Sequence, residues 1–574
     1  MKIALKIIKR PLFWIFLLTL FLRLYRLGEF PYGFHIDEAK IAWNSLSILK
    51  TGHDDHGNLF SLYYNSFGDY RPTGLFYLTI PSIAIFGRSI FATRLPVALF
   101  GALMIFPIYF LINLLDTNKG KSTTNAKAGL LGALLMAISP WQIDLSRATN
   151  EVVVSTFFAL FSLFFLIKLI KSKKEVFGVL SVITIIFSYF FYHAIRFLAP
   201  PILLITFLYY IKEIKRKEVK KWIYICLIVA FVLSIFFSTT KEGLARFNQV
   251  SIFSGVDTTY QIERIRGENS KRNLLTIFFD NKYVIYLKTF MDQYSSYFAG
   301  DFLIGPSGRP YRFATPGSGL ITYVEAILLI SGGIIIVKGK KNLLPLFLLL
   351  VTPLPAAITT EDVPNLSRAF LMLPFLIIIE AYGFEAILLI SKKYKKLITT
   401  TIFSLLTLNF IYFSYMYMVH SINHRPYLKN YFVDSPTYRN MGAKELSLKL
   451  DTLKQKYDKV IITNFPDNLY PWYAFFTNKN PSDFNKTYST QTMERDYENI
   501  IFSQEKCPSD NNLIKYNKQN ILMVDSWECE YQSQIDQGLP LKVVGRITRP
   551  DGTEAYILLE RDRSKPLFLN GVYY

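Results

Sequence analysis

Long apolar segments fill the chain up to about residue 419 and constrain its fold more than any other feature. A helix needs about 20 apolar residues to cross the hydrocarbon core of a bilayer, and about eleven segments meet or approach that length. We therefore predict a polytopic α-helical membrane protein. The expected spans are residues 11–27, 89–115, 127–142, 150–170, 176–192, 195–211, 221–238, 320–337, 342–358, 367–390 and 396–418.

Lysine and arginine concentrate in alternate loops between these segments. Six such loops carry 24 of the 64 basic residues; they are 1–10, 116–127, 168–175, 212–221, 338–341 and 391–396. Basic loops stay on the cytoplasmic side, so we expect the amino terminus inside and the carboxyl-terminal tail outside the plasma (inner) membrane. Of the net charge of +21, +20 lies before residue 420, which indicates membrane orientation rather than nucleic-acid binding.

The chain divides by composition into two predicted domains. Residues 1–419 would form the transmembrane catalytic domain, with long external loops at 28–88 and 239–319. The apolar run after Arg10 has no small-residue cleavage site, so we expect it to remain as the first span. Residues 420–574 have an ordinary soluble composition and are predicted to form an external α/β domain.

Short patterns predict the elements of this tail. Residues 443–456 have helical apolar spacing, and 459–463 and 521–524 are candidate buried strands. Residues 543–547 and 555–559 flank a Pro-Asp-Gly turn and should form a hairpin. The tail has no nucleotide-binding glycine loop, nucleophile elbow or metal-spaced Cys/His set, so we expect a docking or lid module.

Two of the three cysteines, Cys507 and Cys529, lie in the tail. Outside the cytoplasm they could form a disulfide, whereas two buried free thiols are the alternative. So few cysteines exclude a disulfide-dense scaffold.

The first external loop contains two adjacent acids, Asp37 and Glu38. Neighbouring carboxylates beside a membrane are costly unless they are solvated or used in function. The alternative is structural: Asp37 could cap a helix or supply a first-turn charge.

Other charged residues lie at the external ends of the predicted spans. Arg147 and Glu151 are four residues apart, so on one helix they would share a face and could form an ion pair. Arg196, Arg312 and Arg368 oppose the positive-inside trend, which suggests a lipid phosphate as partner. Each could equally be an interfacial anchor or a salt-bridged loop residue.

This placement separates two classes of membrane protein. Transporters tend to place ionisable groups near the bilayer midplane. We expect the functional charges here in the external loops, which favours an enzyme acting on a lipid-borne phosphate.

Taken together, the motifs resemble the GT-C glycosyltransferases, and more narrowly the protein O-mannosyltransferase/ArnT-like group. The resemblance covers essentially the whole chain and is weakest in the tail. The residues that carry it are Asp37-Glu38, then Ser146-Arg147 followed by Glu151, then Glu361 followed by Pro364-Asn-Leu-Ser-Arg368.

The resemblance implies an inverting transfer of a sugar from a polyprenyl-phosphate donor to a lipid, glycan or protein acceptor on the external face. It implies that Asp37 is the general base or orients the acceptor, that Glu38 supports it, and that Glu151 is a second acid of the catalytic site. The residues implied to bind the donor phosphate are Arg147, Arg368, Arg312 and Arg196.

No cofactor is otherwise expected, but some GT-C enzymes use a divalent cation, which Asp37 and Glu151 would hold here. A lipid-glycan transporter or flippase, and an oligosaccharide ligase using the same kind of donor, are the alternatives. Membrane lipids are expected partners and nucleic acid is not.

Overall fold

The computed structural model describes residues 10–66, 69–115, 122–254, 256–268, 274–305, 310–390, 392–420, 440–487, 495–516, 518–529, 535, 539–566, 568–569 and 572–573. The predicted basic loops 1–10, 116–127 and 391–396 lie partly outside these ranges. The chain forms two compact units. The first contains residues 1–25, 62–74 and 97–417, and the second contains 26–61, 75–96 and 418–574.

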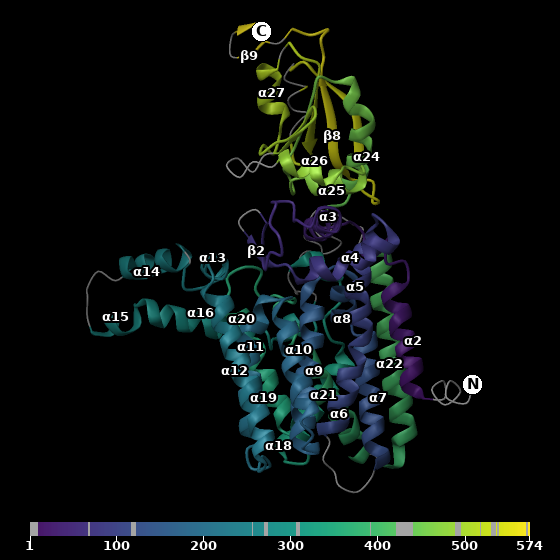
Figure 1. Cartoon of the computed structure of the whole chain (residues 1–574), viewed down its shortest axis with the longest axis vertical. Coiled ribbons are helices and arrows are strands. Elements are labelled where there is room, and N and C mark those ends of the chain that lie inside the picture. The colour runs from purple at the N-terminus through teal and green to yellow at the C-terminus, as the bar shows by residue number, and fades with distance from the viewer. Residues whose placement is uncertain are drawn as a thin grey trace. The chain divides into compact units, whose positions relative to one another are not determined.

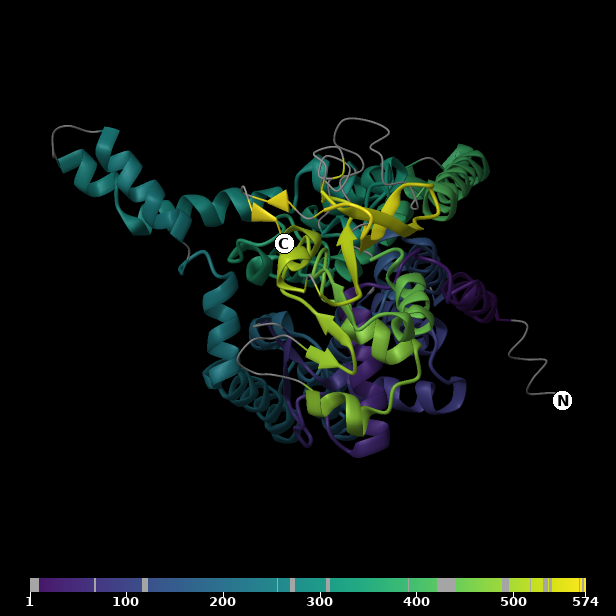
Figure 2. The same cartoon turned by 90° about the horizontal axis from the view of Figure 1, so that it is seen from above.

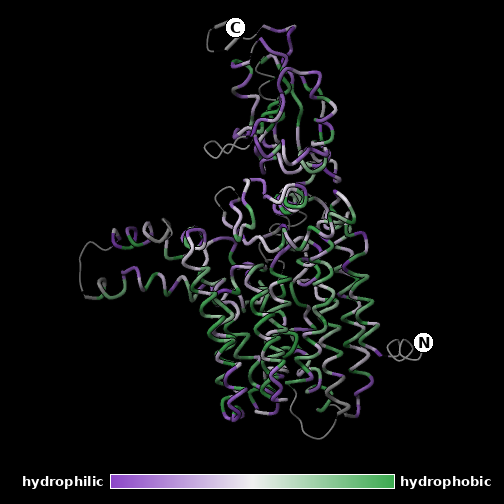
Figure 3. The backbone as a smooth tube through the Cα atoms, in the orientation of Figure 1, coloured by the Kyte–Doolittle hydropathy of each residue, from purple (hydrophilic) through white to green (hydrophobic). Residues whose placement is uncertain are grey.

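The first unit is a bundle of apolar helices (Figure 1). Hydrophobic residues line these helices along most of their length (Figure 3). Its helices are α2 (Pro11–Leu24), α6 (Ile105–Leu115), α7 (Ser122–Ile138), α8 (Pro140–Arg147), α9 (Glu151–Ser172), α10 (Val176–Tyr189), α11 (His193–Tyr209), α12 (Lys217–Thr239), α17 (Gly300–Leu303), α18 (Tyr323–Val337), α19 (Leu344–Val351), α20 (Leu354–Ala357), α21 (Met372–Ile390) and α22 (Lys395–Tyr415). Helix α5 (Ile90–Leu103) starts in the second unit and ends in this one.

Among the described residues, five helices are long and apolar enough to cross a membrane, and a bent pair of helices would make a sixth. Only 17% of the apolar window in Lys395–His420 is buried inside the protein, which suits a surface that faces lipid. Each of the eleven predicted spans coincides with one of these helices or with shorter apolar helices. The chain is therefore a multi-pass membrane protein, and the exact number of spans stays a prediction.

Local sequence determines where several of these helices begin. Asn150 accepts a hydrogen bond from the Val152 N–H at 3.2 Å and so caps α9. Thr322 and Glu325 form a reciprocal capping box at the start of α18. Ser139 caps α8, whose first residue is Pro140. Each capping residue has a non-helical backbone conformation, so the chain turns just before each of these helices.

A lateral arm leaves the bundle between α12 and α17 (Figures 1 and 2). It consists of α13 (Lys241–Val250), α14 (Val256–Glu268), α15 (Leu274–Phe279) and α16 (Lys282–Ser296). The first unit also contains a hairpin of β1 (Tyr63–Ser66) and β2 (Asp69–Pro72).

The second unit contains a six-stranded mixed sheet in the order β4-β5-β3-β6-β8-β7. Strand β3 is parallel to both β5 and β6, and the other pairs are antiparallel. The strands are β3 (Lys459–Ile462), β4 (Arg495–Tyr497), β5 (Ile500–Phe502), β6 (Ile521–Ser526), β7 (Leu541–Thr548) and β8 (Glu554–Arg561), with a short pair β9 (Phe568–Leu569) and β10 (Val572–Tyr573). The helices are α3 (Ile36–Thr51), α4 (Gly74–Phe86), α24 (Ala443–Leu453), α25 (Tyr470–Phe476), α26 (Pro481–Phe484) and α27 (Ser509–Lys515).

Helix α3 of the first external loop belongs to the core of this unit. Phe34 and Trp43 are buried in one hydrophobic cluster with residues of β3, β5, β6 and β8. The Trp472 Nε1–H donates to the Phe34 carbonyl at 2.8 Å, and the Trp43 Nε1–H donates to the Asn485 side chain at 3.1 Å. The first loop and the tail therefore share one core, and the predicted division at residue 419 stays a prediction.

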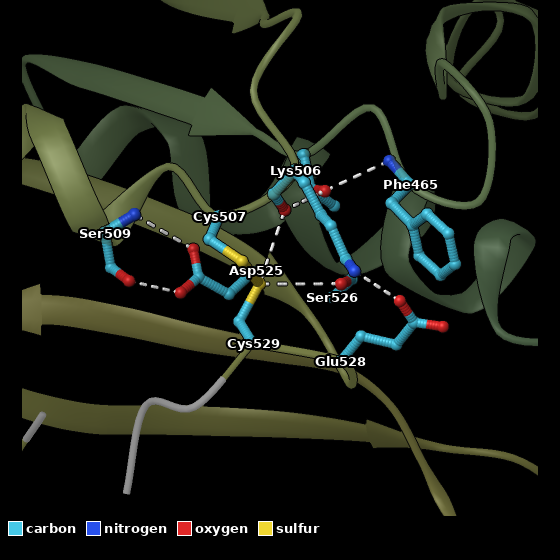
Figure 4. Close-up of a disulfide and its surroundings, with 9 residues drawn as sticks. Phe465, Lys506, Cys507, Ser509, Asp525, Ser526, Glu528 and Cys529 are labelled. Carbon is cyan, nitrogen blue, oxygen red and sulfur yellow. Dashed lines mark hydrogen bonds and ion pairs between the residues drawn. A yellow bond between two sulfur atoms is a disulfide. The ribbon is translucent and has the colours of Figure 1, made fainter. Parts of the chain in front are cut away.

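The predicted strands and hairpin of the tail are present as β3, β6, β7 and β8. Cys507 and Cys529 form a disulfide beside Asp525 (Figure 4). This bridge resolves the alternative that the sequence left open.

Candidate active site

Asp37 lies in the first turn of α3. Before that turn, the His35 ring accepts a hydrogen bond from the Asp37 N–H at 3.2 Å and so caps the helix. The Asp37 carboxylate also lies 3.2 Å from His35 Nδ1, and its side chain is 12% exposed. A carboxylate at a helix amino terminus is stabilised by the helix dipole. Asp37 is thus held in place beside a titratable ring, with part of its surface open.

Glu38 has a different environment from its neighbour. Its carboxylate accepts from the Arg94 Nε at 2.8 Å and from the Arg94 Nη2 at 2.9 Å, and both side chains are buried. It also accepts the His35 N–H at 3.2 Å, which completes a capping box. The same Arg94 donates to the carbonyls of Pro31 and Gly33. These contacts describe a residue that positions the first loop, and catalysis by Glu38 itself stays a prediction.

Two residues of the tail lie next to the start of α3. The Asn440 side chain accepts from the Ile36 N–H at 3.1 Å and donates to Asp467 at 3.0 Å. Burial raises the pKa of Asp467, and the negative charge of Asp37 adds to this rise. Sequence patterns do not predict this arrangement, because about 400 residues separate Asn440 from Ile36 and no local spacing rule reaches that far.

The expectation that Arg147 and Glu151 share a face of one helix is wrong. Helix α8 ends at Arg147 and α9 begins at Glu151, with extended backbone at Ala148 and Asn150 between them. The Arg147 guanidinium donates to the carbonyls of Leu22, Arg23 and Tyr25 and to the Tyr417 hydroxyl. Arg147 therefore ties the α8–α9 turn to the end of α2, and phosphate binding by it stays a prediction.

Tyr192 lies in the turn between α10 and α11. Its phenol is influenced by the charges of Glu151, Arg368 and Arg246. Burial raises the pKa of Tyr192, the charges of Arg368 and Arg246 lower it, and the charge of Glu151 raises it. The charges of Glu151 and Arg368, both predicted site residues, thus influence the same phenol. Arg246 of α13 was missed by the sequence reasoning, because no motif around it distinguishes it from other loop arginines.

Glu361 links the two arginines of this cluster. Its carboxylate accepts from Arg368 at 2.6 Å and lies 3.5 Å from an Arg246 nitrogen. Arg368 also donates to the Thr359 hydroxyl at 2.8 Å and to the Glu361 carbonyl at 2.7 Å. The Glu361 side chain is about half exposed, whereas the side chains of Arg368 and Arg246 are 14% and 19% exposed.

The other two predicted phosphate-binding arginines have different surroundings. Arg196 donates to the Tyr189 carbonyl at 3.1 Å and to the Tyr63 hydroxyl, and its guanidinium lies 4.1 Å from the centre of the Phe237 ring. Arg312 packs over the Phe313 ring at 5.1 Å. Residues 306–309 of the predicted basic turn before Arg312 lie outside the described residues.

The predicted site residues are divided between the two units. Asp37 and Glu38 belong to the second unit, and Glu151 and all the predicted arginines belong to the first. That Asp37 shares one pocket with Glu151 and Arg368 stays a prediction. In the part of the chain that the structure describes, no three His, Cys, Asp or Glu side chains gather to hold a metal ion.

Comparisons with known proteins give one sequence match and several structural ones. Residues 70–238 match the family model described as dolichyl-phosphate-mannose-protein mannosyltransferase. The chain is similar to ArnT from Cupriavidus metallidurans in the apo state, with 12% identity and a TM-score of 0.51 over 95% of this chain and 96% of that chain. No curated protein matches the sequence.

Two further solved structures are similar at lower scores. One is the same ArnT bound to undecaprenyl phosphate, with 11% identity and a TM-score of 0.48 over 95% of this chain and 96% of that chain. The other is the archaeal oligosaccharyltransferase AglB from Archaeoglobus fulgidus, with 14% identity and a TM-score of 0.48 over 95% of this chain and 73% of that chain.

The ArnT likeness extends over nearly the full length of both chains and shows the fold. The family model adds a match in sequence over residues 70–238, which is less than half of the chain. The chain therefore has the fold of ArnT, and residues 70–238 are similar in sequence to the dolichyl-phosphate-mannose-protein mannosyltransferase family.

Proposed function

We propose that the protein transfers a sugar from a polyprenyl-phosphate donor to an acceptor on the external face of the membrane. The observation that carries this proposal is the pair of guanidinium groups, Arg246 and Arg368, that lie at one carboxylate, Glu361. Planar guanidinium groups bind phosphate in a bidentate manner, and two of them next to one another suit a phosphate monoester or diester. ArnT, which has the same fold, binds undecaprenyl phosphate.

In the proposed reaction, the acceptor oxygen attacks the anomeric carbon of the donor sugar. The bond between that carbon and the phosphate oxygen breaks, and its electron pair leaves with the polyprenyl phosphate. Asp37 takes the acceptor proton as general base, and a single displacement inverts the anomeric configuration. Arg246 and Arg368 stabilise the charge that grows on the leaving phosphate, and Glu151 is the second acid of the site.

The proposed topology places the amino terminus in the cytoplasm and the tail outside the plasma membrane. The distribution of basic loops supports this orientation. The Cys507–Cys529 disulfide supports it independently, because disulfides persist in oxidising compartments. The assay below, run with and without a chelator, tests whether Asp37 and Glu151 hold a divalent cation.

The decisive assay incubates the purified protein with a panel of polyprenyl-phosphate sugars and measures release of polyprenyl phosphate, with and without a chelator. Arg368→Ala should raise the donor KM by about 10–100-fold, because charge-assisted bonds to phosphate are each worth about 1.5–3 kcal/mol. Arg264→Ala is the matched control, since Arg264 is an exposed arginine of α14 that pairs only with Glu268 in the described contacts. An unchanged donor saturation curve for Arg368→Ala would remove it from the phosphate site.

A lipid-glycan transporter is the second candidate, because a completely buried acid lies inside a span. We expected functional charges only in the external loops, but Glu380 is completely buried in α21 and neither carboxylate oxygen has a hydrogen-bond partner among the described residues. Intramembrane acids often mark transport pathways. In sealed vesicles a transporter would move the intact lipid-linked sugar between leaflets, whereas the proposed enzyme would cleave it. An oligosaccharide ligase would transfer a whole glycan in the same assay.

A further inference from the structure

The lateral arm begins and ends at the membrane-spanning bundle. Helix α12 is a candidate span that ends at Thr239, and α13 begins two residues later at Lys241. At the other end of the arm, the Tyr294 hydroxyl of α16 donates to the Leu350 carbonyl at 2.7 Å. The Tyr297 hydroxyl accepts the Asn365 N–H at 3.0 Å. The arm is therefore attached at the level where spanning helices end.

The arm exposes large apolar side chains. On α16 the exposed residues Tyr283, Leu287 and Met291 are spaced by four, so they lie on one face of the helix. On α15, Leu275, Phe278 and Phe279 are also more than half exposed. A continuous apolar face of this kind on a protein surface indicates a partner.

The polar residues of the arm lie away from this apolar face. Lys288 and Asp292 are exposed on α16, at helix positions that do not coincide with the Tyr283–Leu287–Met291 stripe. On α14 the exposed residues include Glu263, Arg264, Arg266 and Glu268. An amphipathic helix with aromatic residues on one face and lysine on the other has the composition of helices that lie in the membrane–water interface.

We propose that α15 and α16 lie in the membrane–water interface, with their apolar face among the lipid acyl chains. The arm extends sideways from the bundle, across the direction of the spanning helices (Figures 1 and 2). A helix in that direction, joined to the end of a span, runs along the bilayer surface. Tyrosine and lysine favour this depth, because the tyrosine ring and the lysine aliphatic stem reach the apolar chains while their polar ends reach water.

Lipid explains the apolar face better than a second copy of the chain does. The aromatic and aliphatic residues continue from α15 into α16, and Lys282, at the junction, lies 5.2 Å from the centre of the Tyr283 ring. A lysine beside an interfacial ring can extend to a lipid phosphate. The proposal concerns membrane contact and goes beyond the proposed transfer reaction.

The test uses site-specific fluorescence on the full-length protein. The chain has three cysteines, of which Cys507 and Cys529 are bonded and Cys226 is buried, so an exposed cysteine can be labelled selectively. Tyr283→Cys and Leu287→Cys are labelled with an environment-sensitive thiol-reactive dye, and the unsubstituted protein gives the background. Asp292→Cys on the same helix is the matched control.

Each protein is reconstituted into phosphatidylcholine–phosphatidylglycerol vesicles that contain acyl-chain nitroxide lipids. We expect dye at 283 and 287 to have blue-shifted emission and at least about twofold stronger nitroxide quenching than dye at 292, which aqueous iodide should quench instead. Equal quenching of all three positions by iodide would overturn the proposal. Protection of 283 and 287 from both quenchers, with cysteine cross-linking between copies, would assign the face to a protein interface and also overturn it.

Discussion

Asp37 and Glu38 are adjacent in sequence but differ in what surrounds them. Glu38 forms a buried bidentate pair with Arg94, whereas Asp37 keeps part of its surface open beside His35. Breaking a buried ion pair leaves an uncompensated charge and costs about 3–5 kcal/mol. The two acids should therefore respond differently to removal of their charge.

Asp37→Asn should lower turnover by at least about 100-fold, because it removes the proposed general base, while leaving the thermal unfolding midpoint close to that of the unsubstituted protein. Glu38→Gln should instead lower the midpoint clearly. Glu29→Gln, which alters an exposed pair with Arg26, is the control and should change stability by less than about 1 kcal/mol. Normal turnover of Asp37→Asn would exclude it from the reaction.

Asp525 should give the tail a measurable pH dependence. Burial raises the pKa of Asp525 from 3.8 to about 6, although its carboxylate accepts hydrogen bonds from the backbone and hydroxyl of Ser509 (Figure 4). The folded chain thus binds this proton more tightly than the unfolded chain does. The stabilisation is complete below pH 3.8 and is lost as the pH rises through about 6, by about 2–3 kcal/mol.

The variant Asp525→Asn should lack this fall in stability, because an amide does not titrate. The measurement is the thermal unfolding midpoint of the full-length protein between pH 4 and 7, followed by intrinsic fluorescence. Asp496→Asn, exposed on β4, should keep the original pH dependence. If the Asp525→Asn profile has the same slope as that of the unsubstituted protein, Asp525 does not carry the effect.

At the scale of single residues, motifs suggested candidate site residues but not their contacts. The Asp37-Glu38 pair, Glu151 and Arg368 were chosen from motifs, and their roles stay predictions. The difference in environment between Asp37 and Glu38 was not predicted, because Glu38 binds Arg94, which lies 56 residues further along the chain. Arg246 was missed for the same reason: its partner Glu361 lies 115 residues away.

Helices α18 and α21 pack closely enough to need glycine. A Cβ atom at Gly332 would lie 1.9 Å from the Ile379 carbonyl oxygen, and one at Gly383 would lie 1.8 Å from the Leu328 carbonyl oxygen. Small residues allow the backbones of membrane helices to approach one another in this way.

Gly332→Ala should therefore destabilise the bundle by about 1–3 kcal/mol, since the backbone of α21 must move. Gly333→Ala is the matched control on the same helix, because a Cβ there meets nothing within 4 Å. It should be neutral or stabilise the helix by up to about 1 kcal/mol. The measurement is the free energy of unfolding in a detergent titration followed by far-UV circular dichroism, and equal effects of the two changes would contradict the packing argument.

At the scale of elements, apolar length and turn residues predicted the apolar helices of the bundle and four of the six strands of the tail sheet. These sequence features failed where the chain changes direction, because apolar periodicity does not show where a helix bends. The pattern predicts one span at 127–142 followed by a loop, whereas the structure has two helices, Lys127–Ile138 and Pro140–Arg147, with a 53° bend between them. Helix α4, with its apolar sequence, lay inside a predicted loop because it is only 13 residues long.

At the scale of the whole molecule, the orientation of the tail can be tested directly. Protease added to intact cells stripped of their outer layers should cleave the tail, whereas inverted membrane vesicles should protect it. The spanning bundle is resistant in both cases, because its backbone hydrogen bonds are satisfied within the bilayer. Cleavage of the tail only in inverted vesicles would reverse the proposed topology.

The predicted boundary between two domains at residue 419 shows that composition along the chain does not predict which distant segments pack together. Composition changes sharply near residue 419, but the core of the second unit combines residues from both sides of that boundary. Hydrophobic residues of α3 have no nearby partners in sequence that would predict this packing.

The shared core of α3 and the tail sheet also orders events during synthesis. Phe34 and Trp43 emerge early from the ribosome, yet the strands that bury them end at Arg561. Contacts so distant in sequence form only after the intervening chain has been made. Nascent protein therefore passes through translation with its first acidic helix unsupported, and a prematurely terminated product would lack an ordered Asp37.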